Sequence, residues 1–173
     1  TASDIPNEVS RFDYTWTIKV SPVNGYVYVA TWKGIERSVN GGETFELILT
    51  PEEPTDYYPN YTDIDITTDG LLCAAIGSDG APEYMTSKSG IHVSVDGGDH
   101  WDPITPSSGF PSFYMRIVLD IADDNSVVYF LGHTSGAGPS NHFLWMFDIE
   151  EENWSDRSAN IPAYGGEVGD YDS

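Results

Sequence analysis

Four residues of this sequence could together form a ligand-binding site. They are two aromatic residues, a carboxylate and a cation, namely Trp16, Tyr61, Asp63 and Arg116. Each falls within the first three positions of a strand-like segment when three such segments are aligned on their last apolar residues. In the alternative interpretation, Trp16 packs in a core and Asp63 is a carboxylate satisfied within its own strand or turn.

A pair of carboxylates could instead catalyse glycoside hydrolysis, one as the acid and the other as the base. An inverting enzyme holds the two carboxyl groups about 6.5–9.5 Å apart. Asp63 and Asp170 could be proposed as such a pair, from different parts of the chain. Among 28 Asp and Glu residues a candidate pair is easy to find, so we assign no catalytic residue. The sequence leaves open whether the chain is an enzyme. It favours the interpretation that this chain alone is not one.

Metal-binding chemistry has little support in the sequence. The four histidines show no HExxH pattern and no Cys/His pairing of the kind that holds zinc. The pair Asp63 and Asp65, and the acidic residues of 120–125, could offer oxygen ligands to Ca²⁺. Neither has the full ligand set of a calcium loop, and acidic turns usually serve as turns. We therefore expect no metal or other cofactor, with calcium as a weak alternative.

Two segments of the chain, 34–45 and 90–101, are near copies of each other at a constant offset of 56 residues. Each copy is an alternating apolar run, then Asn or Asp followed by Gly-Gly, then an aromatic residue. This pattern predicts a β-hairpin whose tight turn has positive φ angles. A repeat of this length in strand-like sequence indicates propeller blades or another repeat array.

The two copies resemble the Asp-box, or BNR repeat, of the form Ser/Thr-x-Asp-x-Gly-x-Thr-Trp/Phe. The first copy has Asn40 in place of Asp, and the second has His100 in place of Thr. The resemblance is to the β-propellers of sialidases, sortilin-type receptors, xyloglucanases and photosystem assembly factors. It implies that the boxes are structural turns away from the ligand-binding face, formed by Ser38, Asn40, Gly42, Thr44, Phe45, Ser94, Asp96, Gly98 and Trp101. It also places ligand sites where the innermost strands begin, around a central channel.

The same strand pattern divides the chain into three blade-sized units, approximately 11–50, 61–105 and 114–162. We therefore predict an all-β fold of about three four-stranded antiparallel blades, with essentially no helix. A third hairpin before Trp154 has the position of an Asp-box but lacks the motif. Residues 163–173 look like the lead-in to a further blade, so we interpret 1–173 as a single segment of a partial propeller.

The enzymes of this superfamily need residues that the chain does not clearly offer. A sialidase would need an arginine cluster, a Tyr nucleophile with a Glu partner and an Asp acid. The chain has four arginines, of which Arg37 belongs to an Asp-box strand. No Phe-Arg-Ile-Pro motif precedes the first box. A sialidase interpretation therefore fails, and a xyloglucanase-like one depends on the weak carboxylate pair above.

The charge balance bears on partners and location. The chain has 7 Lys and Arg against 28 Asp and Glu, a net charge of −21. Such a surface repels nucleic acid, and no apolar run approaches the roughly 18 residues that span a bilayer. A solvated acidic surface of this kind favours an extracellular or cell-surface protein. The single cysteine, Cys73, lies in an apolar run and is predicted to be a buried small hydrophobe.

Three functions stay open on this basis. The favoured one is a non-catalytic binding or scaffold segment of a larger secreted or cell-surface propeller, with a glycan or protein held by aromatic loops such as 56–61. The alternatives are part of a glycoside hydrolase and a structural part that closes by oligomerisation.

Association is the last expectation from the sequence. Closed propellers have about four to eight blades, so three blades should expose two flanks. We predict that these flanks include residues such as Phe12, Val27, Phe143 or Trp145. The remaining blades or further copies of the chain would be the partners, and association should increase with salt.

Overall fold

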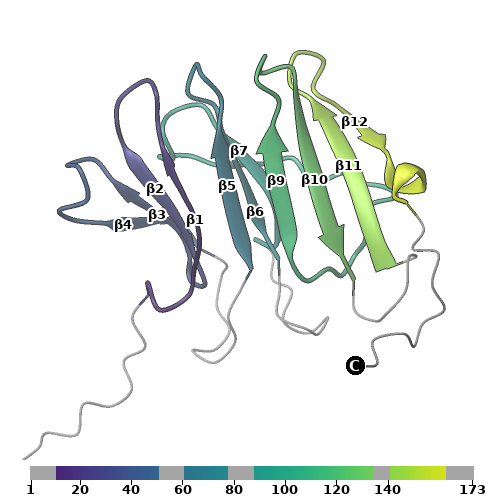
Figure 1. The fold of residues 1–173 in the computed structure, drawn as a ribbon, viewed down its shortest axis with the longest axis horizontal. Coiled ribbons are helices and arrows are strands. Elements are labelled where there is room, and N and C mark those ends of the chain that lie inside the picture. Colours follow the sequence, from purple (N-terminus) through teal and green to yellow (C-terminus); the bar gives the residue numbers. More distant parts are fainter. Residues whose placement is uncertain (1–10, 51–60, 78–87, 135–140, 163–173) are drawn as a thin grey trace, which may run out of the picture.

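A computed structural model describes residues 11–50, 61–77, 88–134 and 141–162 of the chain. These residues form three four-stranded antiparallel sheets and one short 3-10 helix. The sheets lie side by side, from the first in purple to the third in yellow-green (Figure 1). Within the described residues, no helix has the length and apolar character needed to cross a membrane.

Each sheet is a meander, because its strands neighbour one another in chain order. The first sheet contains β1 (Thr15–Val20), β2 (Val27–Thr31), β3 (Gly34–Ser38) and β4 (Glu46–Leu49). The second contains β5 (Thr62–Ile66), β6 (Leu72–Ile76), β7 (Gly90–Ser94) and β8 (Asp102–Pro103). The third contains β9 (Ile117–Ile121), β10 (Val127–His133), β11 (His142–Asp148) and β12 (Asn153–Asp156), followed by the 3-10 helix η3 (Ser158–Asn160). The predicted fold of three four-stranded antiparallel blades is thus confirmed.

The second sheet is buried on both faces, because a neighbouring sheet covers each of them. Every residue of β6 is buried, and its sequence is accordingly an uninterrupted apolar run. One core separates the first and second sheets and is built from Tyr28, Ala30, Ile35, Leu49, Ile64, Leu72, Ala74 and Ile76. The other separates the second and third sheets and includes Cys73, Ala75, Ile91, Leu119, Phe130, Phe143 and Trp145. As predicted, Cys73 is buried, and burial raises the pKa of its thiol to about 12.

Among the residues that the structure describes, each outer sheet has one flank without a neighbouring sheet. On the first sheet Ile18 and Val20 are exposed, and on the third Tyr129 and Leu131 are exposed. Phe12, predicted for an open flank, is 39% exposed and contacts the Phe45 ring.

The prediction that Phe143 and Trp145 lie on an open flank is wrong. Both are buried against the second sheet. Their neighbours Leu144 and Met146 have the opposite orientation, because successive side chains of a strand point to opposite faces. The sequence-based prediction therefore selected the wrong face of β11. Val27, predicted for the other flank, is only partly buried.

Candidate functional site

The aromatic and cationic candidates lie together where the innermost strands begin. Strands β1, β5 and β9 neighbour one another across the three blades. The Trp16 ring lies 5.2 Å from the Tyr61 ring between centroids, and the Arg116 guanidinium lies 5.7 Å from the centre of the Trp16 ring. The Tyr14 ring stacks on Trp16 at 6.4 Å. The structure thus brings Trp16, Tyr61 and Arg116 together and adds Tyr14, and we call these four residues the aromatic cluster.

The aromatic cluster is open to solvent on one side and anchored on the other. Tyr14 is 51% exposed and Arg116 is exposed, whereas Trp16 and Tyr61 are partly buried. Trp16 packs against the core between the first and second sheets. Aromatic faces beside a guanidinium offer stacking surface and charged hydrogen-bond donors. The arrangement can therefore hold a ring-shaped polar ligand, but it contains no carboxylate for acid–base chemistry.

Asp63 does not belong to this surface, because its carboxylate joins the three blades. It is only 8% exposed. One oxygen accepts hydrogen bonds from the Thr17 hydroxyl and from the backbone N–H of Ile64, at 3.0 Å in the second case. The other oxygen accepts the backbone N–H of Leu119 at 3.0 Å. Asp63 is therefore the strand carboxylate of the alternative interpretation.

Asp65 repeats this arrangement two residues further along β5. Its carboxylate lies 2.8 Å from the Lys19 ammonium and accepts the backbone N–H groups of Ile66 and Ile121 at 2.9 and 3.1 Å. The oxygens of both aspartates are thus used within the protein. Within the described ranges, no cluster of three or more His, Cys, Asp or Glu side chains could hold a metal ion. Asp170 and the loop at 56–60 lie outside the described residues.

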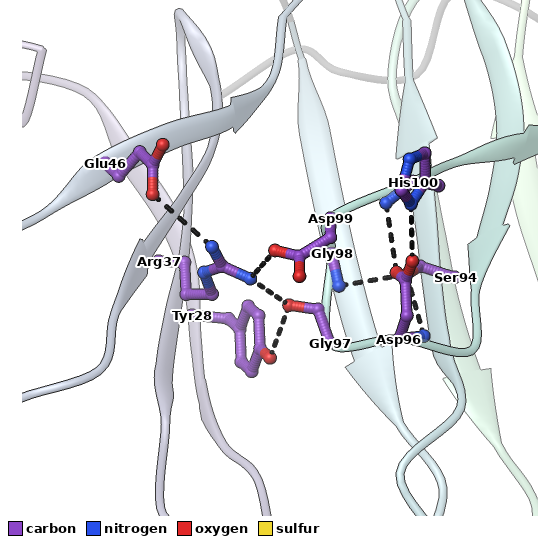
Figure 2. Close-up of polar contacts among 9 residues, drawn as sticks. All are labelled: Tyr28, Arg37, Glu46, Ser94, Asp96, Gly97, Gly98, Asp99 and His100. Carbon is purple, nitrogen blue, oxygen red and sulfur yellow. Dashed lines mark hydrogen bonds and ion pairs between the residues drawn. The ribbon is translucent and has the colours of Figure 1, made fainter.

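The two predicted box turns have the same hydrogen bonds at equivalent positions. In the first, the Ser38 hydroxyl donates to Asn40 and accepts the N–H of Gly42, at 2.9 Å each, while Asn40 accepts the N–H of Thr44 at 3.0 Å. The second turn has the same three bonds, made by Ser94, Asp96, Gly98 and His100 (Figure 2). Both Gly-Gly pairs have positive φ angles. The turns therefore connect β3 to β4 and β7 to β8 in the same way.

The aromatic residues after the turns are both partly buried. Phe45 makes an edge contact with Phe12 at 5.1 Å between ring centroids. Trp101 packs against the core between the first and second sheets.

His100 forms an additional polar contact in the second turn. Its Nδ1 atom lies 2.7 Å from Asp96 Oδ2 (Figure 2). Hydrogen bonding to Asp96 raises the pKa of His100, and hydrogen bonding to His100 holds the pKa of Asp96 well below its usual range. In the first turn the equivalent contact joins the Asn40 amide to the Thr44 hydroxyl at 2.9 Å. The contact thus stays within the turn in both copies.

Arg37 links the first blade to the second turn, a role that the sequence analysis missed. Its guanidinium donates to the Gly97 carbonyl at 2.8 Å and to Asp99 at 2.7 Å, and it reaches Glu46 at 3.3 Å (Figure 2). The Tyr28 hydroxyl donates to the same Gly97 carbonyl at 2.9 Å. The sequence could not reveal this contact, because its two sides lie about 60 residues apart and follow no local pattern.

A polar cleft of about 340 Å³ lies beside this link, between the first and second blades. Its lining includes Asn24, Tyr26, Arg37, Asp69 and Asp99. The Arg37 and Asp99 side chains already bind each other, and Asp69 accepts the Thr67 hydroxyl. Arg37 and Asp99 thus serve the contact between the blades, whereas Asp69 serves a turn of its own blade.

Comparison with solved structures identifies the architecture. The chain is similar to a GH74 enzyme from Niastella koreensis, with a TM-score of 0.58 and 20% identity over 85% of this chain and 22% of that one. It is also similar to a GH74 xyloglucanase from Xanthomonas campestris, with a TM-score of 0.56 and 15% identity over 87% of this chain and 23% of that one. The fold is a partial β-propeller.

These comparisons establish the fold only, because both sequence identities are low. The chain spans less than a quarter of the length of either GH74 structure. No protein-family model and no curated protein sequence matches it.

Proposed function

We propose that the chain is a non-catalytic binding segment of a larger Asp-box propeller outside the cell or on its surface. Its ligand is a glycan, and its ligand surface is the aromatic cluster. One observation carries the proposal: Tyr14, Trp16, Tyr61 and Arg116 come from three blades and meet at the start of the innermost strands. Apolar sugar faces suit aromatic rings, and sugar hydroxyls suit the guanidinium donors.

The use of Asp63 within the fold supports a binding role over a catalytic one. Glycoside hydrolysis generally needs two carboxyl groups free to exchange protons or attack the sugar. Asp63 instead accepts three hydrogen bonds from groups of the protein. The alternative is that the chain is part of a glycoside hydrolase, and its similarity of fold to GH74 enzymes supports this alternative.

The net charge of the chain supports the proposed kind of ligand. At −21 the chain repels polyanions, so nucleic acid and acidic polysaccharides are unsuited. A neutral glycan carries no such penalty. We therefore propose a neutral oligosaccharide, with a protein ligand at the same surface as the alternative.

Titration with neutral oligosaccharides tests the proposal. Xyloglucan and cello-oligosaccharides are added to the chain while tryptophan fluorescence and heat are recorded. We expect a change in tryptophan fluorescence and saturable binding, weakened at least about 10-fold in Tyr14→Ala, because a stacked aromatic face is lost. Val95→Ala is the control, since Val95 is 84% exposed on the hairpin turn between the outer strands β7 and β8, away from the start of the innermost strands.

Two results would overturn the proposal in different ways. Binding that is equal in Tyr14→Ala and Val95→Ala, or no binding of any glycan, would remove the aromatic cluster as a glycan site. Release of reducing ends from xyloglucan would instead favour the hydrolase alternative.

A further inference from the structure

The two open flanks carry opposite halves of an interface that occurs twice inside the chain. Strand register defines the equivalent positions. Lys19 pairs with Tyr28, Asp65 with Cys73 and Asp120 with Tyr129, so Tyr129 in the third blade is equivalent to Tyr28 in the first. Two pairs earlier along each inner strand, Ala30, Ala75 and Leu131 are equivalent.

The open flank of the first blade corresponds to the surface that, in the second and third blades, contacts the preceding blade. Aligned in the same register, Ile18 is equivalent to Ile64 and Leu119. Ile64 and Leu119 are buried between blades, whereas Ile18 is 63% exposed. Val20, equivalent to the partly buried Ile66 and Ile121, is 60% exposed. Both side chains lack only the blade that covers their equivalents.

The open flank of the third blade corresponds to the surface that, in the first and second blades, contacts the following blade. Tyr28 and Ala30 are fully buried against the second blade. Their equivalents Tyr129 and Leu131 are 42% and 43% exposed. The exposed aromatic and aliphatic side chains therefore mark one interface, divided between the two ends of the molecule.

Polar groups match across the two flanks as well. The Tyr28 hydroxyl donates to the carbonyl of Gly97, and the residue 56 positions before Gly97 is Gly41. Gly41 and Gly97 have φ angles of 72° and 77°, so the two turns present this carbonyl alike. Tyr129 can therefore donate to the Gly41 carbonyl of another molecule.

The inner strands provide a second polar match. Asp65 accepts the backbone N–H of Ile121 in the following blade. The equivalent pair across the open flanks is the Asp120 carboxylate and the Val20 N–H. Asp120 is exposed at the third-blade flank, where it can reach such a partner.

We propose that a second copy of this chain docks head to tail, with the third-blade flank of each copy on the first-blade flank of the other. Continuity with the two internal interfaces selects this partner, because each flank lacks what the other provides. Two copies supply six blades, within the range of about four to eight that closes a propeller. The inference makes a second copy of the chain the source of the further blades of the proposed larger propeller, and it does not depend on glycan binding.

Salt controls this association. A net charge of −21 on each copy opposes docking at low ionic strength. The Debye length falls from about 10 Å at 0.1 M salt to about 3 Å at 1 M, so the repulsion is screened while the apolar contact remains. We therefore expect a larger dimer fraction at higher salt.

Sedimentation equilibrium of the chain at 0.1 and 1 M NaCl tests the proposal. The expected species has about 38 kDa, twice the 19.0 kDa of one chain. Ile18→Asp and Leu131→Asp should each weaken dimerisation at least about 10-fold, because each buries a charge in an apolar contact. Tyr129→Phe, which removes one hydroxyl from each of the two interfaces of the dimer, should weaken it about 5- to 100-fold. Val95→Asp is the matched control, since Val95 is 84% exposed on a hairpin turn and not on a flank.

Mixing the two disruptive variants separates head-to-tail docking from like-with-like docking. Ile18→Asp keeps an intact third-blade flank, and Leu131→Asp keeps an intact first-blade flank, so the mixture should form heterodimers that neither variant forms alone. Four outcomes would overturn the proposal: a monomer at both salt concentrations, assemblies larger than a dimer, a dimer lost in only one of the two variants, or equal dimerisation of Tyr129→Phe and the parent. Near-ultraviolet circular dichroism of each variant confirms that its fold is retained.

Discussion

Replacement of Asp63 by alanine should destabilise the chain severely, because this carboxylate joins all three blades. The change leaves the buried N–H groups of Ile64 and Leu119 without their acceptor, and the Thr17 hydroxyl loses its bond. Each buried donor left unsatisfied costs about 1–3 kcal/mol, and removal of a buried charge offsets part of this loss. We expect a decrease of about 3 kcal/mol in the free energy of unfolding.

Urea denaturation followed by tryptophan fluorescence measures this loss. Asp63→Asn should lose less than Asp63→Ala, because an amide keeps the shape and one acceptor oxygen. Asp123→Ala is the control, since Asp123 is an exposed carboxylate in the turn after β9, and it should change stability by less than about 0.5 kcal/mol.

The result separates the two interpretations of Asp63. If Asp63 served a ligand or a reaction, its loss would spare the fold and abolish binding or turnover. Equal urea midpoints for Asp63→Ala and the parent would refute the assignment of this carboxylate to the links between blades.

The remaining predictions concern the second turn and its contact with the first blade. Arg37→Ala should cost about 1–3 kcal/mol of unfolding free energy in urea melts, because a largely buried guanidinium loses charged hydrogen bonds between blades; an unchanged midpoint would show that the link is incidental. Trp101→Ala should cost about 2–3 kcal/mol, below the roughly 3–5 kcal/mol of a core aromatic, since Trp101 is only partly buried; a midpoint equal to the parent's would contradict its packing role. His100→Thr should be near neutral in stability, because threonine occupies the equivalent position in the first turn; a clear loss would show that the imidazole matters. In an NMR titration His100 should have a pKa above its ordinary 6.5, and Asp96→Asn should bring it back. Because the pKa of His100 is raised in the folded state, its contact with Asp96 stabilises the fold fully below pH 6.5. This stabilisation is lost as the pH rises through the raised pKa.

The hairpin turns were predictable because their determinants are local. Ser38 and Ser94, four residues before a glycine whose N–H they accept, place the whole hydrogen-bond pattern within a few residues. The positive φ angles at Gly41 and Gly42 are conformations that glycine adopts without strain. The constant spacing of the copies then gave the blade architecture.

The orientation of β11 was hard to predict, because both of its faces carry large apolar residues. Phe143 and Trp145 point to the second blade, while Leu144 and Met146 point the other way. In most half-buried strands a polar face reveals the orientation. In β11 the polar residues of the outward face, His142 and Asp148, lie only at the two ends of the strand, so this signal is weak and packing against the second blade decides which residues are buried.

Contacts between blades were the part of the candidate site that was hardest to predict from the sequence. Thr17 lies 46 residues from Asp63, and Leu119 lies 56 residues from it. From the sequence alone, Asp63 could be either a ligand residue or a satisfied strand carboxylate, and both were considered. The choice depends on where β1 and β9 lie relative to β5, which is a property of the folded chain.

Strand β5 combines a structural role and the proposed binding role in neighbouring positions. Asp63 and Asp65 bind backbone groups of β9, and Thr17 and Lys19 of β1 reach these same two carboxylates. Tyr61, two residues before Asp63, joins the aromatic cluster at the start of the strand. The hydrogen bonds fix three inner strands relative to one another, so the cluster residues at the starts of these strands are held in place before a ligand arrives. A preorganised surface of this kind loses less entropy on binding. Substitutions at the aspartates should therefore reduce stability and ligand affinity together, whereas substitutions at Tyr14 should reduce affinity alone.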